Sequence, residues 1–395
     1  MTRRIRFTSW HDAAGLGGGS HDGTAVTDGA LVLGTPSGVR EYDDPHRDVP
    51  SQKYEYAVWT SPEVTPGFDF KELVASWNAR TPGGTWLEVA LRATGRDGDC
   101  TPWYVMGRWA ESDQEIAPAS VPGQSDEQGQ VDVDRLTLNE EGCWSTYQMR
   151  ATLFRRPGST ATAAVSLLGC VASDGSTDER DASTDRDGAA GTVLDVPAYS
   201  QRLHLGEYPQ WANGGESWCS PTSTSMVLDY WGLGPTRSDY AWVDAGLVDR
   251  FVPYAARHTF DHAYRAPGNW SFNTAYAARF GAVAFVTRLR SLAEAELFVA
   301  AGVPLIVAVA FTRDELEGAG YDTYGHLAVV VGFDEHGNVV CNDPASHEIP
   351  SNDEVRATFD RAQFERAWMR SSGGITYVIR PPDVPLPQAP AEANW

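Results

Sequence analysis

Several features that would assign a simple class are scarce in this chain. It has only five cysteines among 395 residues, an odd number and widely spaced, which excludes a disulfide framework and fits a reducing compartment. No apolar run approaches the roughly 20 residues that cross a bilayer. Basic residues are outnumbered, because 31 Lys and Arg face 53 Asp and Glu, a net charge of −22. Such a field repels phosphate backbones and anionic lipids, so we expect no nucleic-acid and no membrane partner.

The start of the chain lacks the apolar segment of a secretory signal. Its basic residues run directly into the polar pair His11 and Asp12. We therefore expect a cytoplasmic protein, or an extracellular one if the true start lies upstream. In the second case Cys100 and Cys143 could form a disulfide, whereas both stay reduced in a cytosol.

A chain of this length has room for two ordinary domains. Hydrophobic residues make up 42% and aromatic residues 11%, including 14 Trp, which excludes global disorder. The stretch from Ser173 has no aromatic or large aliphatic residue, so it cannot bury enough surface to offset its ordering entropy. We therefore expect a β-domain over 1–172 with its first ~25 residues loosely ordered, an acidic flexible linker over 173–192, a second domain over 193–382 and a Pro-rich tail over 383–395.

Alternating hydrophobicity dominates the first domain. In Trp86–Ala93 every second residue from Leu87 is apolar, whereas Glu88 and Arg92 face the other side. Similar runs, separated by Gly, Pro, Asp and Asn, occur at Tyr54–Thr60, Leu73–Arg80, Trp103–Trp109, Val131–Leu138, Tyr147–Phe154 and Ala163–Val171. Seven or more short strands with turn residues between them predict an antiparallel β-sandwich or jelly roll.

Aromatic side chains give this domain a second interpretation. Sandwiches often bind carbohydrate through exposed rings, so a glycan or a protein is the partner we consider for it. The candidate rings are Trp59, Trp77, Trp103 and Trp109. A Trp within a strand more often packs in the core, which is the structural alternative.

The second domain has a different pattern. Helical periodicity occurs at Pro221–Trp231, Tyr240–Phe251, Thr274–Phe280, Leu292–Ala301 and Arg361–Met369. Apolar strands are expected at Val303–Phe311, Leu327–Phe333, Val339–Cys341 and Ile375–Ile379. Helices come first and most strands later, which is typical of an α+β domain with an antiparallel sheet.

The segment around Cys219 is a candidate for nucleophilic chemistry. Pro221 fits the first turn of a helix, where its missing N–H costs no hydrogen bond, and Gly232 supplies a C-terminal stop. Cys219 therefore lies at or just before a helix N-terminus, where unpaired N–H groups and the helix dipole favour the thiolate. The alternative is a small buried residue at the start of the helix.

A thiol nucleophile needs a base, and His326 is the best candidate. It opens the apolar strand that runs to Phe333. Asp343 ends the next strand of a predicted hairpin, whose turn is Asp334–Asn338. Neighbouring antiparallel strands bring their ends together, so Asp343 can accept from one ring nitrogen of His326 while the other faces Cys219.

An oxyanion donor is expected upstream of the cysteine. Gln201 ends the segment Val196–Gln201 and carries a neutral amide donor suited to a developing negative oxygen. Gln210 and Asn213 are the rival donors. Of the three, Gln201 is our first choice.

These segments together resemble the C39-like peptidases, which are papain-fold cysteine peptidases. The family patterns Val-Pro-x-x-Ser-Gln, Trp-Cys-Gly-Pro-x-Ser, Gly-His-x-x-Val-Val-x-Gly and Asn-Asp-Pro correspond to Val196–Gln201, Trp218–Ser223, Gly325–Gly332 and Asn342–Pro344. The resemblance covers about 193–382 and does not reach the β-domain. It implies an α+β papain-like fold with Cys219 as nucleophile, His326 as base, Asp343 as its orienting partner and Gln201 as oxyanion donor.

Two features depart from the family pattern. Ser220 replaces the usual Gly, so a positive φ at this position would be strained. The interval between Gln201 and Cys219 is longer than usual.

The expected activity is that of a cysteine peptidase or amidase, which cleaves a peptide or amide bond through a Cys-His-Asp triad and an acyl-enzyme. We expect no cofactor and no metal. Two alternatives stay open, a catalytically inert papain-like fold that serves as a binding module and a metal enzyme built on His258 and His262 around Asp261.

Overall fold

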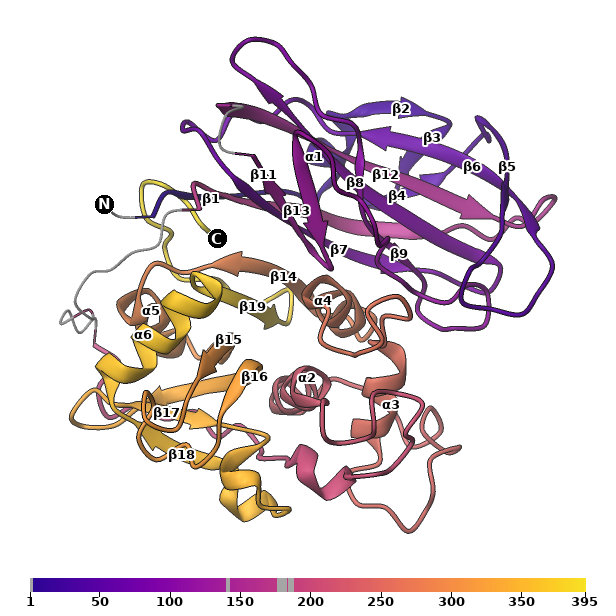
Figure 1. The fold of residues 1–395 in the computed structure, drawn as a ribbon. Coiled ribbons are helices and arrows are strands. Elements are labelled where there is room, and N and C mark those ends of the chain that lie inside the picture. Colours follow the sequence, from indigo (N-terminus) through magenta and orange to yellow (C-terminus); the bar gives the residue numbers. More distant parts are fainter. Residues whose placement is uncertain (1–2, 140–142, 176–182, 184–187) are drawn as a thin grey trace. The chain divides into compact units, whose positions relative to one another are not determined.

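The computed structural model describes residues 3–139, 143–175, 183 and 188–395. Its contacts divide the chain into two compact units (Figure 1). The first comprises Arg4–Gly175, Phe260–Arg265 and Trp395, and the second contains the described residues of Met1–Arg3, Ser176–Thr259 and Ala266–Asn394. Of the predicted linker 173–192, residues 176–182 and 184–187 lie outside the described residues.

The first unit consists mainly of two antiparallel sheets, which confirms the prediction of a mostly β N-terminal region. The first sheet has the strand order β10-β11-β7-β13-β4-β3, and β1 also pairs with β13. Its strands are β1 (Ile5–Trp10), β3 (Thr24–Thr27), β4 (Ala30–Leu33), β7 (Glu72–Arg80), β10 (Gly129–Asp132), β11 (Arg135–Leu138) and β13 (Ala164–Ser173). A short helix, α1 (Ala13–Gly17), follows β1.

The second sheet has the order β2-β6-β12-β8-β9, with β5 also paired to β6. Its strands are β2 (Ser20–Asp22), β5 (Gly38–Tyr42), β6 (Gln52–Thr60), β8 (Thr85–Gly95), β9 (Tyr104–Trp109) and β12 (Trp144–Arg155). Leu87, Val89 and Leu91 share one fully buried face of β8, as the alternation predicts. The opposite face is also buried at Trp86 and Ala90 and becomes partly exposed at Arg92.

The aromatic candidates of this unit divide into two groups. Trp59, Trp77 and Trp109 are buried in the core, so they cannot present their rings to a ligand. Trp103 is partly exposed.

Two predictions for the first unit are wrong. The loose order expected of the first ~25 residues is not found, because within the described residues 3–25 β1 pairs along its length with β13 and buries Ile5 and Trp10. Val131–Leu138 is not one strand but the hairpin of β10 and β11. Val133 adopts a positive φ of 57° at the turn between them. A β-branched residue rarely has this conformation, so the apolar alternation gave no sign of a turn at Val133.

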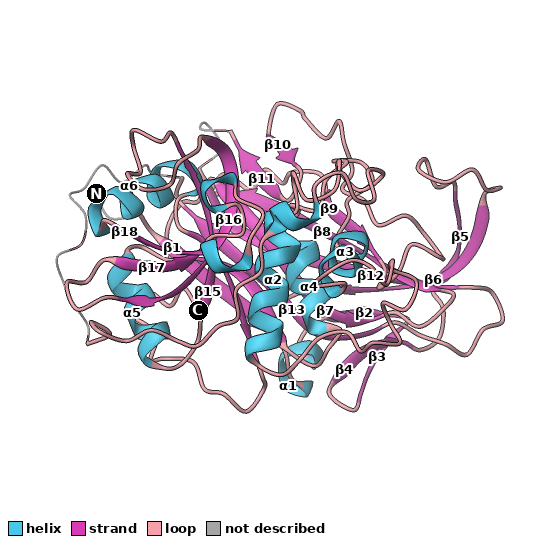
Figure 2. Cartoon of the chain, turned by 90° about the horizontal axis from the view of Figure 1, so that it is seen from below, coloured by secondary structure: helices cyan, strands magenta, loops and turns pink. Residues whose placement is uncertain are grey.

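The second unit is built on a six-stranded antiparallel sheet with the order β14-β19-β15-β16-β17-β18. Its strands are β14 (Val283–Arg288), β15 (Leu305–Phe311), β16 (Thr323–Phe333), β17 (Val339–Asn342), β18 (Arg356–Phe359) and β19 (Ile375–Arg380). The helices are α2 (Cys219–Tyr230), α3 (Phe251–His258), α4 (Trp270–Ala278), α5 (Leu292–Ala300) and α6 (Arg361–Ser372), with 3₁₀ turns η1 (Gln201–His204), η2 (Ser346–Glu348) and η3 (Asn352–Glu354). Figure 2 shows these helices around the strands.

Helix packing in this unit brings α2 to the middle of the sheet. α2 contacts β16 and also the helices α3 and α4, whereas α6 contacts β15. The first turn of α2 is therefore held beside the strand that contains His326. Among the described residues no helix is long and apolar enough to cross a membrane.

Two further predictions need correction here. The helix expected over Tyr240–Phe251 is absent, and α3 begins only at Phe251. The Asp244 carboxylate accepts a hydrogen bond from the Gly246 N–H at 2.8 Å, a local turn that competes with helix formation. The linker also ends earlier than residue 192, because the Gly191 N–H already donates to the Asp334 carbonyl at 3.1 Å, directly after β16.

The packing of β1 gives a stability prediction. Trp10 lies edge-on to Trp59, with ring centroids 5.6 Å apart. We expect Trp10→Ala to destabilise the first unit by about 3–5 kcal/mol, as for other buried aromatic truncations. Calorimetric unfolding measures this, with the exposed Thr27→Ala on β3 as control, which we expect to change stability by at most ~0.5 kcal/mol. Equal effects of the two substitutions would contradict the packed position of β1.

Candidate functional site

Cys219 is the first residue of α2, as the position of Pro221 predicts. The preceding Trp218 is fully buried, and its indole N–H donates to the Trp211 carbonyl at 2.6 Å. This bond fixes the loop that leads into the helix. Cys219 itself is partly exposed.

The strain expected at Ser220 is absent. Ser220 lies in the first turn of α2 and is not among the residues with positive φ. Its hydroxyl lies 3.0 Å from the Tyr377 hydroxyl of β19. Ser220 thus replaces the family's usual Gly without backbone strain, and its hydroxyl has a hydrogen-bond partner.

A hydrogen bond between α2 and β16 sets the position of the cysteine relative to His326. The Ser223 hydroxyl donates to the Leu327 carbonyl at 3.0 Å, and Leu327 directly follows His326 on β16. The Leu327 N–H in turn contacts the Cys219 sulfur. Helix and strand are thus joined at the residue next to the imidazole.

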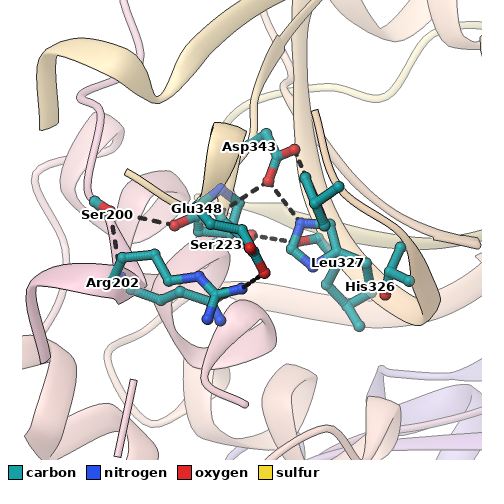
Figure 3. A network of polar contacts seen from close by, with 12 residues as sticks. Ser200, Arg202, Ser223, His326, Leu327, Asp343 and Glu348 are labelled. Carbon is teal, nitrogen blue, oxygen red and sulfur yellow. Dashed lines mark hydrogen bonds and ion pairs between the residues drawn. The ribbon is translucent and has the colours of Figure 1, made fainter. Parts of the chain in front are cut away.

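His326 and Asp343 form a close buried pair (Figure 3). The Nε2 atom of His326 lies 2.7 Å from Oδ1 of Asp343, and the two residues are 4% and 2% exposed. β16 and β17 form the expected hairpin, in which the Asp334 N–H donates to the Asn338 carbonyl. Since Nε2 faces Asp343, we infer that Nδ1 is the ring nitrogen through which His326 lowers the pKa of the Cys219 thiol.

Tyr321 completes the surroundings of Asp343 and was missed in the sequence. Its hydroxyl donates to Oδ2 of Asp343 at 2.8 Å, and the Ala345 N–H donates to Oδ1 at 2.9 Å. The Tyr321 ring also stands edge-on to the His326 ring, with centroids 5.8 Å apart. Tyr321 lies in the loop between β15 and β16, where no periodic pattern distinguishes it.

The electrostatics of the three side chains favour a thiolate beside an imidazolium. Burial disfavours the imidazolium, but the Asp343 carboxylate and then Cys219 outweigh this and raise the pKa of His326 to about 10. Packing around the sulfur likewise disfavours its charge, yet His326 and the N–H groups of Leu327 and Ser220 lower the pKa of the Cys219 thiol. Burial opposes ionisation of Asp343 too, and the charge and hydrogen bond of His326 overcome it and lower the pKa of that carboxyl.

Gln201 lies beside the loop that precedes the cysteine. Its Nε2 donates to the carbonyls of Gly215 at 2.8 Å and Glu216 at 3.0 Å. The residue is 2% exposed, and among the described residues its Oε1 has no hydrogen-bond partner. The rival donors Gln210 and Asn213 are both exposed.

The segments that contain Gln201 and Asp343 are joined by hydrogen bonds from a backbone N–H and from the side chain of Asn342. The Gln201 N–H donates to the Pro344 carbonyl at 2.9 Å. The Asn342 amide donates to the carbonyls of Val196 and Pro197 at 3.2 and 3.1 Å. Segments that are nearly 150 residues apart in sequence therefore form one wall of the site.

The metal alternative has little support in this geometry. His258 ends α3 and its Nδ1 lies 2.8 Å from the Tyr254 carbonyl oxygen. His262 and Asp261 belong to the first unit instead, where Asp261 accepts from the Ser120 N–H. Within the described ranges no group of three or more His, Cys, Asp or Glu side chains is arranged to hold a metal ion.

Comparison with known proteins gives two family matches. Residues 6–173 match the Peptidase C39 N-terminal domain, and residues 193–375 match the Peptidase_C39 like family. No curated protein matches the chain.

Two solved structures show weak similarity. A C39-like peptidase from Bacillus anthracis is 18% identical, with a TM-score of 0.30 over 48% of this chain and 98% of that one. A chain of the infectious bursal disease virus Gx strain is 11% identical, with a TM-score of 0.21 over 45% of this chain and 35% of that one. At these TM-scores neither structural similarity carries an argument. The likeness to C39 peptidases therefore rests on the two family matches.

The lowered pKa of Cys219 gives a pH prediction. A free thiol loses reactivity as pH falls through about 8.5, whereas we expect alkylation of Cys219 to stay fast well below that pH. His326→Ala removes the imidazolium, so the midpoint should return toward the ordinary value. Mass spectrometry of the iodoacetamide-labelled peptides measures both rates, and the exposed Cys100 serves as internal control. A Cys219 profile that coincides with that of Cys100 would refute the ion pair.

Proposed function

Residues 193–375 belong to the Peptidase_C39 like family, and from this premise we propose that the chain is a cysteine peptidase or amidase with Cys219, His326 and Asp343 as its catalytic triad. The observation that carries the proposal is the placement of His326. Its Nε2 lies 2.7 Å from Asp343, and it is followed on β16 by Leu327, the residue on which α2 is docked through Ser223. In this position His326 lowers the pKa of the Cys219 thiol. This arrangement supplies a nucleophile, a proton carrier and an orienting group in hydrogen-bonding order.

The proposed reaction has two stages. The Cys219 thiolate attacks the carbonyl carbon of the substrate amide, and a C–S bond forms. As the tetrahedral intermediate collapses, the C–N bond breaks and the Nδ1–H of His326 gives its proton to the leaving amine. Neutral His326 then takes a proton from water, whose oxygen attacks the thioester. The C–S bond breaks, and the acid leaves with thiolate and imidazolium restored.

We propose that Gln201 and the backbone N–H of Cys219 stabilise the oxyanion. The helix N-terminus supports the backbone donor, because its first N–H groups lack partners within the helix. Gln201 has both Nε2 hydrogens committed to the carbonyls of Gly215 and Glu216. Its amide must therefore exchange one of these acceptors for the substrate oxygen during the reaction.

We also interpret the two units in terms of fold and role. The two sheets of the first unit fit a β-sandwich accessory domain, and its match to the Peptidase C39 N-terminal domain associates it with peptidases. The helix α2 packed on the sheet of the second unit fits a papain-like fold. A peptide is the substrate class that the family assignment supports.

Cleavage of a peptide library tests the activity. Wild-type protein and Cys219→Ala are incubated with the library, and the products are compared by mass spectrometry. We expect cleavage by the wild type and a loss of at least ~10³-fold in the variant, since removal of a triad nucleophile abolishes the covalent route. Cys341→Ala, which changes a buried thiol two residues before Asp343, is the matched control and should retain activity. Identical products from wild type and Cys219→Ala would overturn the assignment in favour of a binding module.

Tyr321 provides a test of the His326–Asp343 pair. Tyr321→Phe removes one hydrogen bond to a buried carboxylate, an interaction worth about 1.5–3 kcal/mol. We expect kcat to fall about tenfold or more with little change in KM. The pKa of Asp343 should rise, because its carboxylate loses a hydrogen-bond donor. The carboxylate then stabilises the imidazolium of His326 less, so the pKa of His326 should fall from about 10. The basic limb of the pH–rate profile should therefore move to lower pH.

Tyr240→Phe serves as the control for this substitution, because Tyr240 is not in contact with the three side chains and should leave the profile unchanged. A Tyr321→Phe enzyme that loses stability but keeps the wild-type pH profile would show that Tyr321 has only a packing role.

A further inference from the structure

Four arginines gather on one face of the first unit, and we call them the arginine patch. Arg40, Arg92, Arg108 and Arg150 come from β5, β8, β9 and β12 of the six-stranded sheet. On β8 and β12 they alternate with fully buried residues such as Leu91 and Met149, so they occupy the opposite face of the sheet. Further along the same face Trp86 and Phe154 are buried in a separate hydrophobic cluster, and the partly exposed arginines lie beside it.

Glu88 is the acidic residue of this patch. Its carboxylate lies 2.9 Å from Arg108 and 3.6 Å from Arg40. Arg92 instead donates to the neutral Gln148 Oε1 at 2.7 Å. The patch thus combines four positive charges with one negative charge, on a chain whose net charge is −22.

Arg150 has no carboxylate partner among the described residues. Its guanidinium lies over the ring of Trp103, 4.3 Å from the ring centroid, and that of Arg92 lies 4.6 Å from the same ring. Partial burial lowers the pKa of Arg150, and the charges of Arg40 and Arg92 add to this effect, which Glu88 opposes. An anion beside Arg150 would relieve the repulsion between these guanidinium groups.

We propose that the arginine patch binds an acidic polysaccharide, with an oxyanion of the sugar held by Arg92 and Arg150 beside Trp103. The planar guanidinium presents a fork of N–H donors that matches carboxylate and sulfate oxygens. The aromatic rings under the arginines orient these forks. Tyr56 lies 5.1 Å below Arg40 and Tyr42 lies 5.2 Å below Arg108, so stacked arginines are distributed across four strands.

The position of the patch favours a saccharide over an acidic peptide. Extended peptides bind mainly through main-chain hydrogen bonds at a free sheet edge, and helical ones require an apolar groove. The patch lies on the face of a sheet, where β8 and β12 are paired with neighbours on both sides. A ligand at this position can be recognised only by side chains. This favours a saccharide, whose charged groups project from the sugar rings. This proposal is independent of the peptidase activity.

Affinity electrophoresis of the full chain tests the proposal. Separate gels contain polygalacturonate, which carries carboxylates, heparin, which carries sulfates, poly-L-glutamate as an acidic peptide, or neutral dextran. At about 0.15 M ionic strength the Debye length is about 8 Å, so repulsion by the distant acidic surface is screened. We expect retardation in at least one acidic polysaccharide gel and none in dextran. The gel that retards the protein identifies the oxyanion.

Matched substitutions locate the site. Arg150→Gln should weaken retardation about tenfold or more, because it removes charge-assisted hydrogen bonds. Arg150→Lys keeps the charge without the fork and should restore binding only in part. Arg96→Gln removes one charge from the same unit at an exposed residue paired with Asp69, and it should bind like wild type. Thermal unfolding verifies that each variant is folded.

Three results would overturn the proposal. They are equal retardation of Arg150→Gln and Arg96→Gln, no retardation by either acidic polysaccharide, and selective retardation by poly-L-glutamate. The last result would indicate an acidic peptide as ligand instead.

Discussion

The buried contact between Asp343 and His326 is the constraint on which the second unit depends. A carboxylate that is 2% exposed loses most of its hydration, a cost of several kcal/mol that only close partners offset. Asp343 has three of them, the His326 ring, the Ala345 N–H and the Tyr321 hydroxyl. The hairpin of β16 and β17 provides the first, and the chain on either side of that hairpin provides the others. Because all three are needed, the strand ends and the adjoining loop are held in one arrangement.

The same contact determines the ionisation of the sulfur. An imidazolium next to an aspartate remains protonated at pH values where a free histidine is neutral, and this positive charge is directed at Cys219. The helix N-terminus adds partial positive charge, and the docking of Ser223 on Leu327 keeps the helix in place. The lowered pKa of the Cys219 thiol thus depends on elements from both α2 and the sheet. A change in the packing between them would alter the pKa of the thiol even if no residue of the pair were replaced.

Local rules account for much of what could be predicted from the sequence. Helix-start chemistry placed Cys219 at the first residue of α2, and strand alternation gave the buried face of β8. Predictions from periodicity failed where a local turn or a contact with a distant strand determined the structure instead. Val133 interrupts an apolar run with a turn, Asp244 closes a turn where a helix was expected, and the early strand β1 is ordered only by pairing with β13. Tyr321 could not be recognised because it lies in a loop without periodicity and its partner Asp343 comes only after the next two strands, β16 and β17.

The loop before Cys219 explains why its sequence contains two consecutive glycines. Gly214 adopts a φ of 71°, and a Cβ atom on Gly215 would collide with the Gln201 carbonyl oxygen. Ala212 and Asn213 also have positive φ, a conformation that costs free energy for residues with a side chain. The two hydrogen bonds from Gln201 and the one from Trp218 to Trp211 offset this cost. If substrate draws the Gln201 amide away from Gly215 or Glu216, the loop loses part of this support. Under the proposed mechanism, oxyanion binding by Gln201 and the position of Cys219 would therefore be energetically coupled.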